Sequence, residues 1–327
     1  MAPPPLEALS ATLLRWLGAP STIDNLQRVS GGASRETWLF DAHLDGLTYP
    51  LVLRRDPAVN NSQTDRSTEY QLIAAAEAAG VAVPTVRVML GPDDGLGDGF
   101  IMDRVDGETI PRKILRDETY AEARGLLTAQ CATSLAAIHA VPQSSLPKLA
   151  HQDARVQIRQ WQSFLDSFGE PHPAFELGLR WMSERIPETV GAPQLVHGDF
   201  RNGNFIVGPD GLRAVLDWEL AHLGDPIEDL GWLCVRAWRF GNTDQPAGGF
   251  GTIAELLDCY EAAGGRRPSD DELRFWIALG TVKWGGICMM QAFTHLNGAV
   301  RSVELAAIGR RVAENEWDLL KAIDGEW

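Results

Sequence analysis

The chain keeps its strand patterns and its helix patterns in separate regions. Short stretches of alternating apolar and polar residues occupy the first third, whereas apolar residues at helical spacing dominate the remainder. This segregated order favours an α+β fold over a doubly wound parallel sheet, in which strands and helices would alternate along the chain. The sequence therefore predicts two lobes, a small β-rich lobe at residues 1–104 and a larger, mostly helical lobe at residues 105–327.

The small lobe is expected to contain a five-stranded sheet and a helix. After a leading amphipathic helix, two strand patterns flank a glycine-rich run at 30–34. A third strand is expected at 49–55 and a helix at 65–80, where Gly80 gives a helix-ending signal. Two further strands surround an Asp-Asp-Gly turn at 93–95.

The large lobe is expected to be a set of helices with one β insertion. The insertion is interpreted as a small hairpin at 194–218. Helical patterns are found at 118–140, 151–168, 174–186, 227–239, 252–263, 270–293 and 299–323.

Three polar residues of the β insertion have a spacing that suggests chemistry. Asp199 is followed five positions later by Asn204, and Asp217 ends the next strand pattern. A carboxylate can accept a proton from a hydroxyl, while amide and carboxylate oxygens bind Mg²⁺. Asp-x-x-x-x-Asn, a strand and a further Asp is the spacing of a kinase catalytic loop and its metal-binding Asp. Each residue alone would be interpreted as a turn former or a cap, but the triple together disfavours that interpretation.

A second interpretation of the same loop is a metal-dependent hydrolase built on His197-Gly198-Asp199. None of the other six histidines forms an H-E-x-x-H or similar pair, so the pattern offers no further ligands. We therefore expect His197 to order the loop through hydrogen bonds.

The motifs HGDFRNGN, VLDWE and GDPIEDLGWL resemble those of the aminoglycoside phosphotransferase family, over roughly residues 24–300. The likeness is strongest to the branch that contains 4-hydroxyacyl-CoA kinase domains fused to acyl-CoA dehydrogenases. It implies a bilobal protein-kinase-like fold, and ATP and Mg²⁺ as cofactors. It also implies that Asp199 is the catalytic base and that Asn204 and Asp217 are the metal ligands. Arg201 lies where many protein kinases carry a lysine that meets the γ-phosphate, and Asp229 matches a buried residue that braces the loop.

A nucleotide site also needs a cover for the phosphates. Gly31, Gly32 and Ser34 lie between two predicted strands, where backbone N–H groups can approach phosphate oxygens closely. An ordinary hairpin loop would have the same composition, so this signal is weak by itself. None of the four lysines follows a glycine, which excludes a P-loop NTPase.

The lysine that kinases carry on the third strand is absent, because no lysine precedes Lys113. An arginine must replace it, and strand alternation places Val52 and Arg54 on one face and Arg55 on the other. We expect Val52 under the adenine and Arg54 at the phosphates, although a solvated edge position for the arginine and a role for Arg55 both stay open. Glu69 on the following helix is the predicted partner of this cation.

The connection between the lobes is expected to bind adenine through its backbone. The segment Met102-Asp103-Arg104-Val105 follows the last strand of the small lobe, and Asp103 and Val105 are assigned as backbone contacts.

The formal net charge of -15 disfavours nucleic acid or an anionic membrane as a partner. No run of about 18 apolar residues is present, so no membrane span is expected. The four cysteines form no C-x-x-C pair, which favours reduced thiols in the cytoplasm.

The acceptor is less constrained by the sequence. Residues 225–300 contain ten acidic and six basic residues, so acid is not concentrated where a polycation would bind. Four tryptophans of the same region are expected in the core or along an apolar pocket: Trp232, Trp238, Trp276 and Trp284. A hydroxyacyl-CoA or another small hydroxylated metabolite therefore suits the sequence at least as well as an aminoglycoside.

These observations predict a phosphotransferase that moves the γ-phosphate of ATP to a hydroxyl of a small molecule, with Mg²⁺ and with Asp199 as base. The alternative is a catalytically silent nucleotide-binding or scaffold protein. The missing strand lysine favours this alternative, whereas the intact Asp199, Asn204 and Asp217 oppose it.

Overall fold

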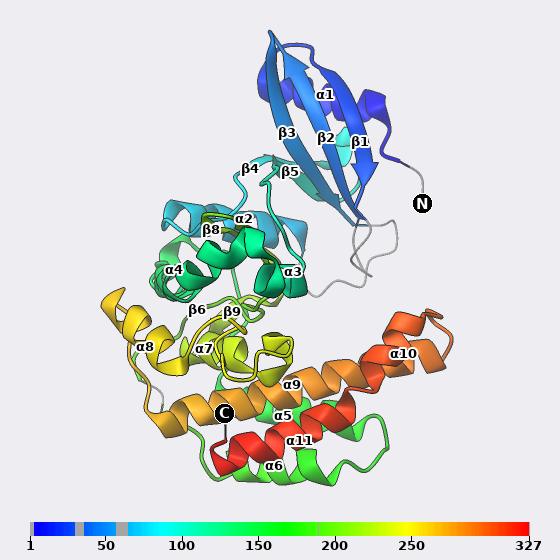
Figure 1. The fold of residues 1–327 in the computed structure, drawn as a ribbon. Helices are drawn as coiled ribbons and strands as arrows, with labels where there is room; N and C mark the ends of the chain where they lie inside the picture. The colour runs from blue at the N-terminus through cyan, green and yellow to red at the C-terminus, as the bar shows by residue number, and fades with distance from the viewer. Residues whose placement is uncertain (1–2, 30–35, 57–64, 189, 327) are drawn as a thin grey trace.

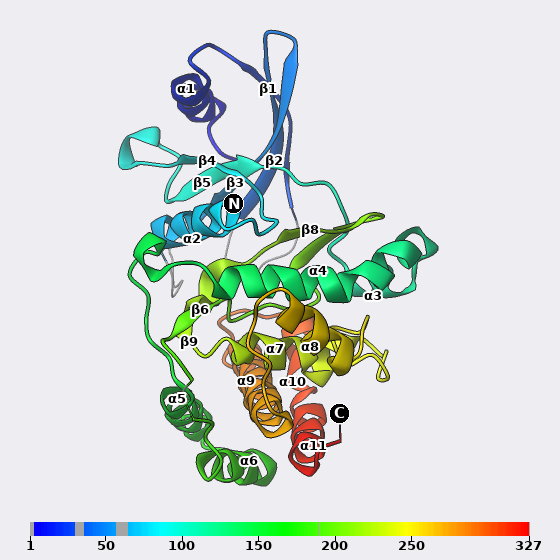
Figure 2. The same ribbon diagram turned by 90° about the vertical axis from the view of Figure 1, so that its left-hand side faces the viewer.

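The two-lobed α+β architecture is confirmed. The computed structural model describes residues 3–29, 36–56, 65–188 and 190–326. A twisted sheet with its helices forms one end of the molecule, and a larger body made mostly of helices forms the other (Figures 1 and 2). The predicted boundary at residue 104 stays a prediction, although the last strand of the sheet ends at Asp103.

The small lobe is built on an antiparallel sheet with helices on both faces. The strand order is β1-β2-β3-β5-β4. The strands are β1 (Thr22–Arg28), β2 (Glu36–Leu44), β3 (Leu47–Arg55), β4 (Val86–Met89) and β5 (Gly99–Asp103). Helix α1 (Leu6–Leu17) and helix α2 (Arg66–Ala78) lie on opposite sides of this sheet (Figure 2).

Side chains of β3 alternate between these two faces. Leu51 and Leu53 belong to the same buried cluster as Leu9 and Leu13 of α1. Val52 belongs instead to the main core, together with Leu72 of α2. Because successive strand residues point to opposite faces, Arg54 follows Val52 toward the large lobe.

The large lobe contains nine helices among the described residues. They are α3 (Pro111–Arg116), α4 (Ala121–His139), α5 (Ala154–Asp166), α6 (Pro173–Ser183), α7 (Ile227–Cys234), α8 (Ile253–Ala262), α9 (Asp270–Leu296), α10 (Val303–Gly309) and α11 (Val312–Asp324). Short 3₁₀ helices of this lobe are Glu118–Tyr120, Gln143–Ser145, Trp218–Leu220 and Arg236–Arg239, and a further one, Pro92–Asp94, lies in the small lobe. None of the described helices is both long and apolar enough to cross a membrane.

Two of the predicted helices are each divided into two. The segment 227–239 is interrupted at Val235, whose backbone is extended with φ -56° and ψ 134°. The segment 299–323 separates into α10 and α11. A Cβ on Gly309 would lie 2.5 Å from the Ala292 Cβ of α9, so glycine permits close packing at the end of α10. Apolar periodicity does not show such breaks, because both halves keep an apolar face.

The expectation of a single hairpin at 194–218 is wrong. Strand β6 (Gln194–Val196) pairs with β9 (His222–Gly224), and only β7 (Phe205–Gly208) and β8 (Gly211–Val215) form a hairpin with each other. Along the chain, the hairpin therefore lies between the two strands of a second sheet. The loops that connect the two sheets lie close together and contain the predicted catalytic residues.

Candidate active site

The predicted catalytic residues lie in the loops between the two small sheets. Asp199 is in the loop from β6 to β7, Asn204 directly precedes β7, and Asp217 follows β8. The Leu216 N–H donates to the Asn204 carbonyl at 2.8 Å, which joins the two loops next to Asp217. Asp217 has the left-handed backbone conformation, with φ 69° and ψ 64°. This conformation is uncommon for residues other than glycine, and Asp and Asn tolerate it best.

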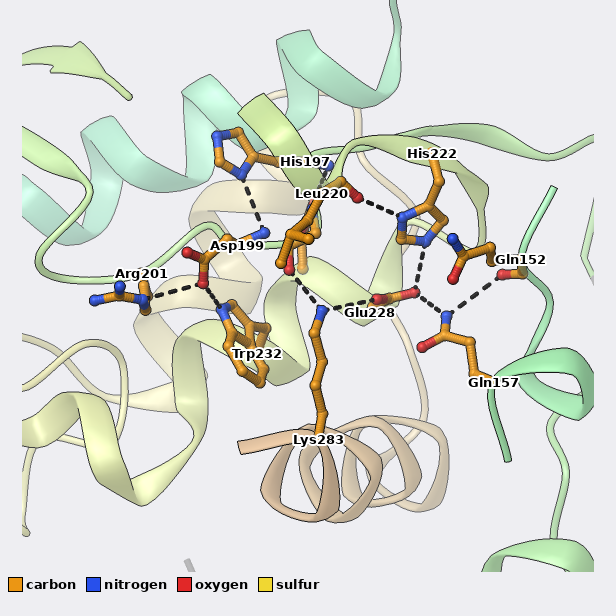
Figure 3. Close-up of polar contacts among 12 residues, drawn as sticks. Gln152, Gln157, His197, Asp199, Arg201, Leu220, His222, Glu228, Trp232 and Lys283 are labelled. Atoms are coloured by element: carbon orange, nitrogen blue, oxygen red, sulfur yellow. Dashed lines mark hydrogen bonds and ion pairs between the residues drawn. The ribbon is translucent and has the colours of Figure 1, made fainter. Parts of the chain in front are cut away.

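The Asp199 carboxylate receives hydrogen bonds from three side chains, of which Arg201 and Trp232 are drawn in Figure 3. Its Oδ1 accepts from the Trp232 indole Nε1 at 2.8 Å and from Arg201 Nε at 3.0 Å. Its Oδ2 accepts from Asn204 Nδ2 at 2.6 Å. The side chain keeps 15% of its surface exposed, so the group is fixed in position and still accessible.

The loop before Asp199 is held by a buried carboxylate. Asp229 of α7 accepts the His197 N–H at 2.7 Å and the Gly198 N–H at 2.9 Å. Its Oδ2 also accepts from His139 Nε2 of α4 at 3.1 Å. Burial works to raise the pKa of Asp229, but the hydrogen bonds from His139 and the loop outweigh it and lower the pKa. A charged carboxylate therefore anchors the loop.

His197 orders the loop through both ring nitrogens. Its Nδ1 accepts the Asp199 N–H at 3.2 Å, and its Nε2 donates to the Leu216 carbonyl at 3.1 Å. Burial lowers the pKa of the ring, in keeping with this neutral tautomer. Within the described residues no group of three or more His, Cys, Asp or Glu side chains is placed to hold a metal ion. His197 therefore orders the loop through hydrogen bonds.

Arg54 reaches from the small lobe to the catalytic loops. Its Nη2 lies 2.7 Å from Asp217 Oδ1, and its Nη1 lies 3.2 Å from Glu69 Oε1 of α2. Arg55 instead pairs with Glu36 at 2.8 Å, within the small lobe. Of the two arginines that the sequence left open, Arg54 is the one that faces the predicted metal ligand.

Glu69 belongs to a buried ionic group that the sequence did not reveal. Besides Arg54, it contacts Arg66, which is one turn earlier on α2 and fully buried. Arg66 Nε in turn lies 2.9 Å from Asp56 Oδ1. This group fixes the Glu69 carboxylate beneath β3. The sequence contained one signal for this group, because Arg and Glu three positions apart lie on the same face of a helix and can form an ion pair.

The remaining residues predicted to contact the nucleotide differ in their burial and hydrogen bonding. Val52 is buried in the main core. The Asp103 N–H donates to the Thr85 carbonyl at 2.9 Å, so only the Asp103 carbonyl is left for adenine. Among the described residues, the Val105 N–H makes no hydrogen bond. Gly31, Gly32 and Ser34 lie outside the described residues.

The donor set suits Mg²⁺ in combination with phosphate oxygens. Asn204 directs its amide nitrogen to the Asp199 carbonyl at 2.9 Å as well as to the carboxylate, so its amide oxygen points the other way. One amide oxygen and one Asp217 carboxylate are few ligands by themselves. Mg²⁺ commonly binds to one or two protein oxygens and completes its shell with substrate phosphates and water.

A second buried network lies beneath the catalytic loop. Lys283 of α9 donates from Nζ to the Gly198 carbonyl at 2.7 Å and lies 4.5 Å from the Trp232 ring centroid. Its Nζ is 3.8 Å from Glu228 Oε1. Glu228 accepts from His222 Nε2 at 3.0 Å and from Gln157 (Figure 3). Helix α9 is thereby connected to the residue that precedes the predicted base.

The family model of the phosphotransferase enzyme family matches residues 25–267, which is most of the chain. The chain belongs to this family. The predicted enzyme class, a phosphotransferase, is confirmed by this membership. The two-lobed fold of the family is present over the matched region and continues beyond it through α9, α10 and α11.

Relatives of this phosphotransferase include parts of longer proteins. It is 28% identical over 331 residues to acyl-CoA dehydrogenase family member 11 of Gallus gallus, covering 93% of this chain and 41% of that protein. It is 27% identical over 337 residues to family member 10 of Mus musculus, covering 96% of this chain and 31% of that protein. The chain thus spans less than half the length of these relatives.

Solved structures share the phosphotransferase fold over nearly the whole chain. A putative aminoglycoside phosphotransferase from Ralstonia eutropha superposes with a TM-score of 0.77 at 23% identity and covers 98% of both chains. A thermostable mutant of aminoglycoside phosphotransferase APH(4)-Ia, in ternary complex with AMP-PNP and hygromycin B, gives a TM-score of 0.61 at 16% identity, covering 97% of this chain and 98% of that one. At these identities the likeness establishes the fold alone.

Sequence reasoning missed several residues that support the predicted base of this phosphotransferase. Trp232 was assigned only to the core or to a pocket wall, although its N–H reaches Asp199. Lys283 was counted among the lysines and given no role. Its signal was present, because a lone lysine within the apolar run ALGTVKWGGICMM is rarely buried without a partner.

Proposed function

We propose that the chain is an ATP- and Mg²⁺-dependent kinase that phosphorylates a hydroxyl of a small molecule. The observation that carries the proposal is the arrangement around the two loops. Asp199 is held by three donors, Asn204 and Asp217 lie on adjacent loops, and Arg54 reaches Asp217 from the other lobe. Phosphoryl transfer requires such a set of a base, cation ligands and a positive side chain.

The proposed reaction uses Asp199 as the proton acceptor. The hydroxyl oxygen of the acceptor forms a bond to the γ-phosphorus, and its proton passes to the Asp199 carboxylate. The bond between the γ-phosphorus and the bridging oxygen breaks, and its electron pair leaves with ADP. Arg201, next to the base, would meet the transferred phosphoryl group. Bound Mg²⁺, held by Asn204 and Asp217, would neutralise charge on the phosphate oxygens.

Arg54 and the lobe connection would bind the nucleotide. Arg54 is held by Glu69 beside the loops, so its guanidinium is available to phosphates as well as to Asp217. The Val105 N–H and the Asp103 carbonyl supply one donor and one acceptor for the adenine edge. A neighbour of the same fold was solved with AMP-PNP, which supports ATP as the donor.

The acceptor is proposed to be a neutral or anionic hydroxylated metabolite, with a hydroxyacyl-CoA as the first candidate. Arg201 packs over Trp238 with 4.5 Å between its Cζ and the ring centroid, and its Nε bonds Asp199, so a fixed cation borders the base. An aminoglycoside would bring further positive charge to this position, and desolvating an unpaired charge costs several kcal/mol. The likeness to parts of two acyl-CoA dehydrogenase family members agrees with an acyl-CoA acceptor.

An assay of ADP release with paired acceptors tests this proposal. Aminoglycosides and 4-hydroxyacyl-CoA compounds are supplied at equal concentration, and the thioester should give the higher kcat/KM. Efficient turnover of an aminoglycoside, with kcat/KM on the order of 10⁴ M⁻¹s⁻¹ or more, would reverse the choice of acceptor.

The Asp199→Asn variant separates a kinase from a silent nucleotide-binding protein. Asparagine keeps the shape of the side chain and removes the proton acceptor. We expect nucleotide binding to stay within about twofold of wild type and kcat to fall on the order of 10²- to 10⁴-fold. Equal ADP release by wild type and variant would refute the role of Asp199. Binding of ATP without any turnover by the wild type would favour the silent protein.

A further inference from the structure

We propose that Trp232 and Lys283 are positioning residues for Asp199, and that they leave Oδ2 as the oxygen that takes the proton. The inference rests on the proposed function and deepens it. It assigns a task to α7 and α9, neither of which contributes to the loops themselves.

The hydrogen bonds of Asp199 leave one position open for the acceptor. An ionised carboxylate has about four lone-pair sites, two on each oxygen. Trp232 and Arg201 use both sites of Oδ1, at 2.8 and 3.0 Å. Asn204 uses one site of Oδ2, at 2.6 Å. The second site of Oδ2 is therefore the one that an acceptor hydroxyl can approach without displacing a donor.

Trp232 fixes the rotation of the carboxylate because the indole is buried and packed between Trp238 and Lys283. It is a buried residue of α7, and its ring lies 5.2 Å from the ring of Trp238 between centroids. The Lys283 ammonium lies over the Trp232 ring, 4.5 Å from its centroid. A planar ring packed in this way has one direction for its N–H, and that direction is toward Oδ1.

Burial of an indole does not by itself require this hydrogen bond. Among the described residues, Trp238, Trp276 and Trp284 bury their indole nitrogens without a hydrogen-bond partner. This chain therefore tolerates an unsatisfied indole N–H in several places. The bond from Trp232 to the predicted base is specific to this position.

Lys283 supports the same geometry from the backbone side. It donates to the Gly198 carbonyl, directly before Asp199, at 2.7 Å. Its Nζ also lies 3.8 Å from Glu228 Oε1, and His222 and Gln157 hold that carboxylate in place. A buried ammonium whose partners are all fixed has little freedom to shift. One side chain of α9 thus contacts both the indole that bonds the Asp199 carboxylate and the peptide group directly before Asp199.

The experiment measures ADP release from Mg·ATP with water as the phosphoryl acceptor, so that no identified metabolite is needed. Trp232→Phe keeps an aromatic ring at this position and removes the N–H together with the pyrrole part of the indole. Trp276→Phe is the matched control, because it removes an indole N–H that has no partner. We expect Trp232→Phe to lower kcat about tenfold with an unchanged KM for Mg·ATP, which is the pattern of an interaction lost in the transition state. The control should match wild type.

A second measurement does not depend on turnover. The indole ¹⁵N–¹H resonance of Trp232, identified by its loss in Trp232→Phe, should shift in the Asp199→Asn variant. The resonance of Trp276 should not. A Trp232 resonance that is unchanged by Asp199→Asn would overturn the inference.

Comparison with Asp199→Asn distinguishes the two levels of the proposal. If Asp199→Asn releases ADP as fast as wild type, the proposed function fails and the positioning role fails with it. If Asp199→Asn is slow while Trp232→Phe equals wild type, only the positioning role is overturned. Lys283→Met should reproduce the loss in kcat, and Lys283→Arg should restore part of it. If Lys283→Met does not fold, Trp232→Phe still decides the outcome.

Discussion

At the scale of single residues, His222 and Glu228 form a buried ion pair below the catalytic loop. His222 Nε2 donates to Glu228 at 3.0 Å, and Nδ1 donates to the Leu220 carbonyl at 2.9 Å, so both ring nitrogens carry protons. Burial acts to lower the pKa of His222, and Lys283 does so too, but the Glu228 carboxylate outweighs them and raises it. The pKa of Glu228 is lowered, since His222 and Lys283 outweigh the effect of burial.

The pair predicts a specific dependence of stability on pH. Because the folded-state pKa of His222 is raised, its contribution is complete below about pH 6.5, the ordinary histidine value, and is lost as pH rises through the folded value. Each unit of the rise corresponds to about 1.4 kcal/mol. We expect the difference in unfolding free energy between wild type and His222→Gln to shrink from pH 6 to pH 9 in urea titrations. A difference that stays constant over this range would contradict a charged His222.

The sequence allowed Asp199, Asn204 and Asp217 to be named because their roles depend on a short local spacing. Trp232 and Lys283 act across 33 and 85 positions of the chain, through contacts that only the packing of helices creates. No pattern within the sequence links an indole on one helix to a carboxylate on a distant loop. The choice between Arg54 and Arg55 lies between these cases, since alternation along a strand favours one face and the tertiary structure identifies what lies there.

At the scale of elements, the packing of α7 against α9 limits which side chains fit between them. A Cβ on Gly231 of α7 would lie 2.5 Å from the Trp276 Cβ and 2.8 Å from its backbone carbon. Backbone atoms cannot move aside as a flexible side chain does. In contrast, a Cβ on Gly125 of α4 would meet nothing within 4 Å. The two helical glycines therefore differ only in their surroundings.

This difference predicts opposite effects of one substitution. Gly231→Ala should destabilise the protein by about 1–3 kcal/mol or more through overpacking. Gly125→Ala should stabilise it by about 0.5–1 kcal/mol, because alanine is the better helix former. Thermal unfolding of both variants beside wild type measures the effect. A lower melting temperature for Gly125→Ala, or an unchanged one for Gly231→Ala, would contradict the packing described.

The elements themselves were predictable to different degrees. Strands β1 to β5 and helix α2 follow from alternation, turn residues and caps, all of which act within a few positions. The pairing of β6 with β9 was not predictable, because a returning strand of three residues has no signal of its own. The break between α10 and α11 depends on contact with α9, which the apolar pattern of either helix does not contain.

At the scale of the whole molecule, Arg54 and Asp217 connect the two lobes. The contact joins β3 of the small lobe to the loop after β8 of the large lobe, at 2.7 Å. If nucleotide and Mg²⁺ bind at this position, they bind only to the folded chain and stabilise it. A ligand at about 100 times its Kd adds about 2.7 kcal/mol.

We therefore expect Mg·ATP to raise the melting temperature, and EDTA to remove most of the increase. Asp217→Ala should lose more of the increase than Asn204→Ala, because the first change removes a charged ligand and the second a neutral one. Calorimetric titration with Mg·ATP gives the same order as binding constants. Wild-type affinity in Asp217→Ala would contradict the assignment of Asp217 to the metal.

The ammonium that supports the base lies outside the part of the chain that the family model matches. That part ends at residue 267, and α9 begins at Asp270. A chimera joined between these two points would take its catalytic loop from one parent and the lysine beneath it from the other. Recombination at this junction would therefore alter turnover without changing any catalytic side chain.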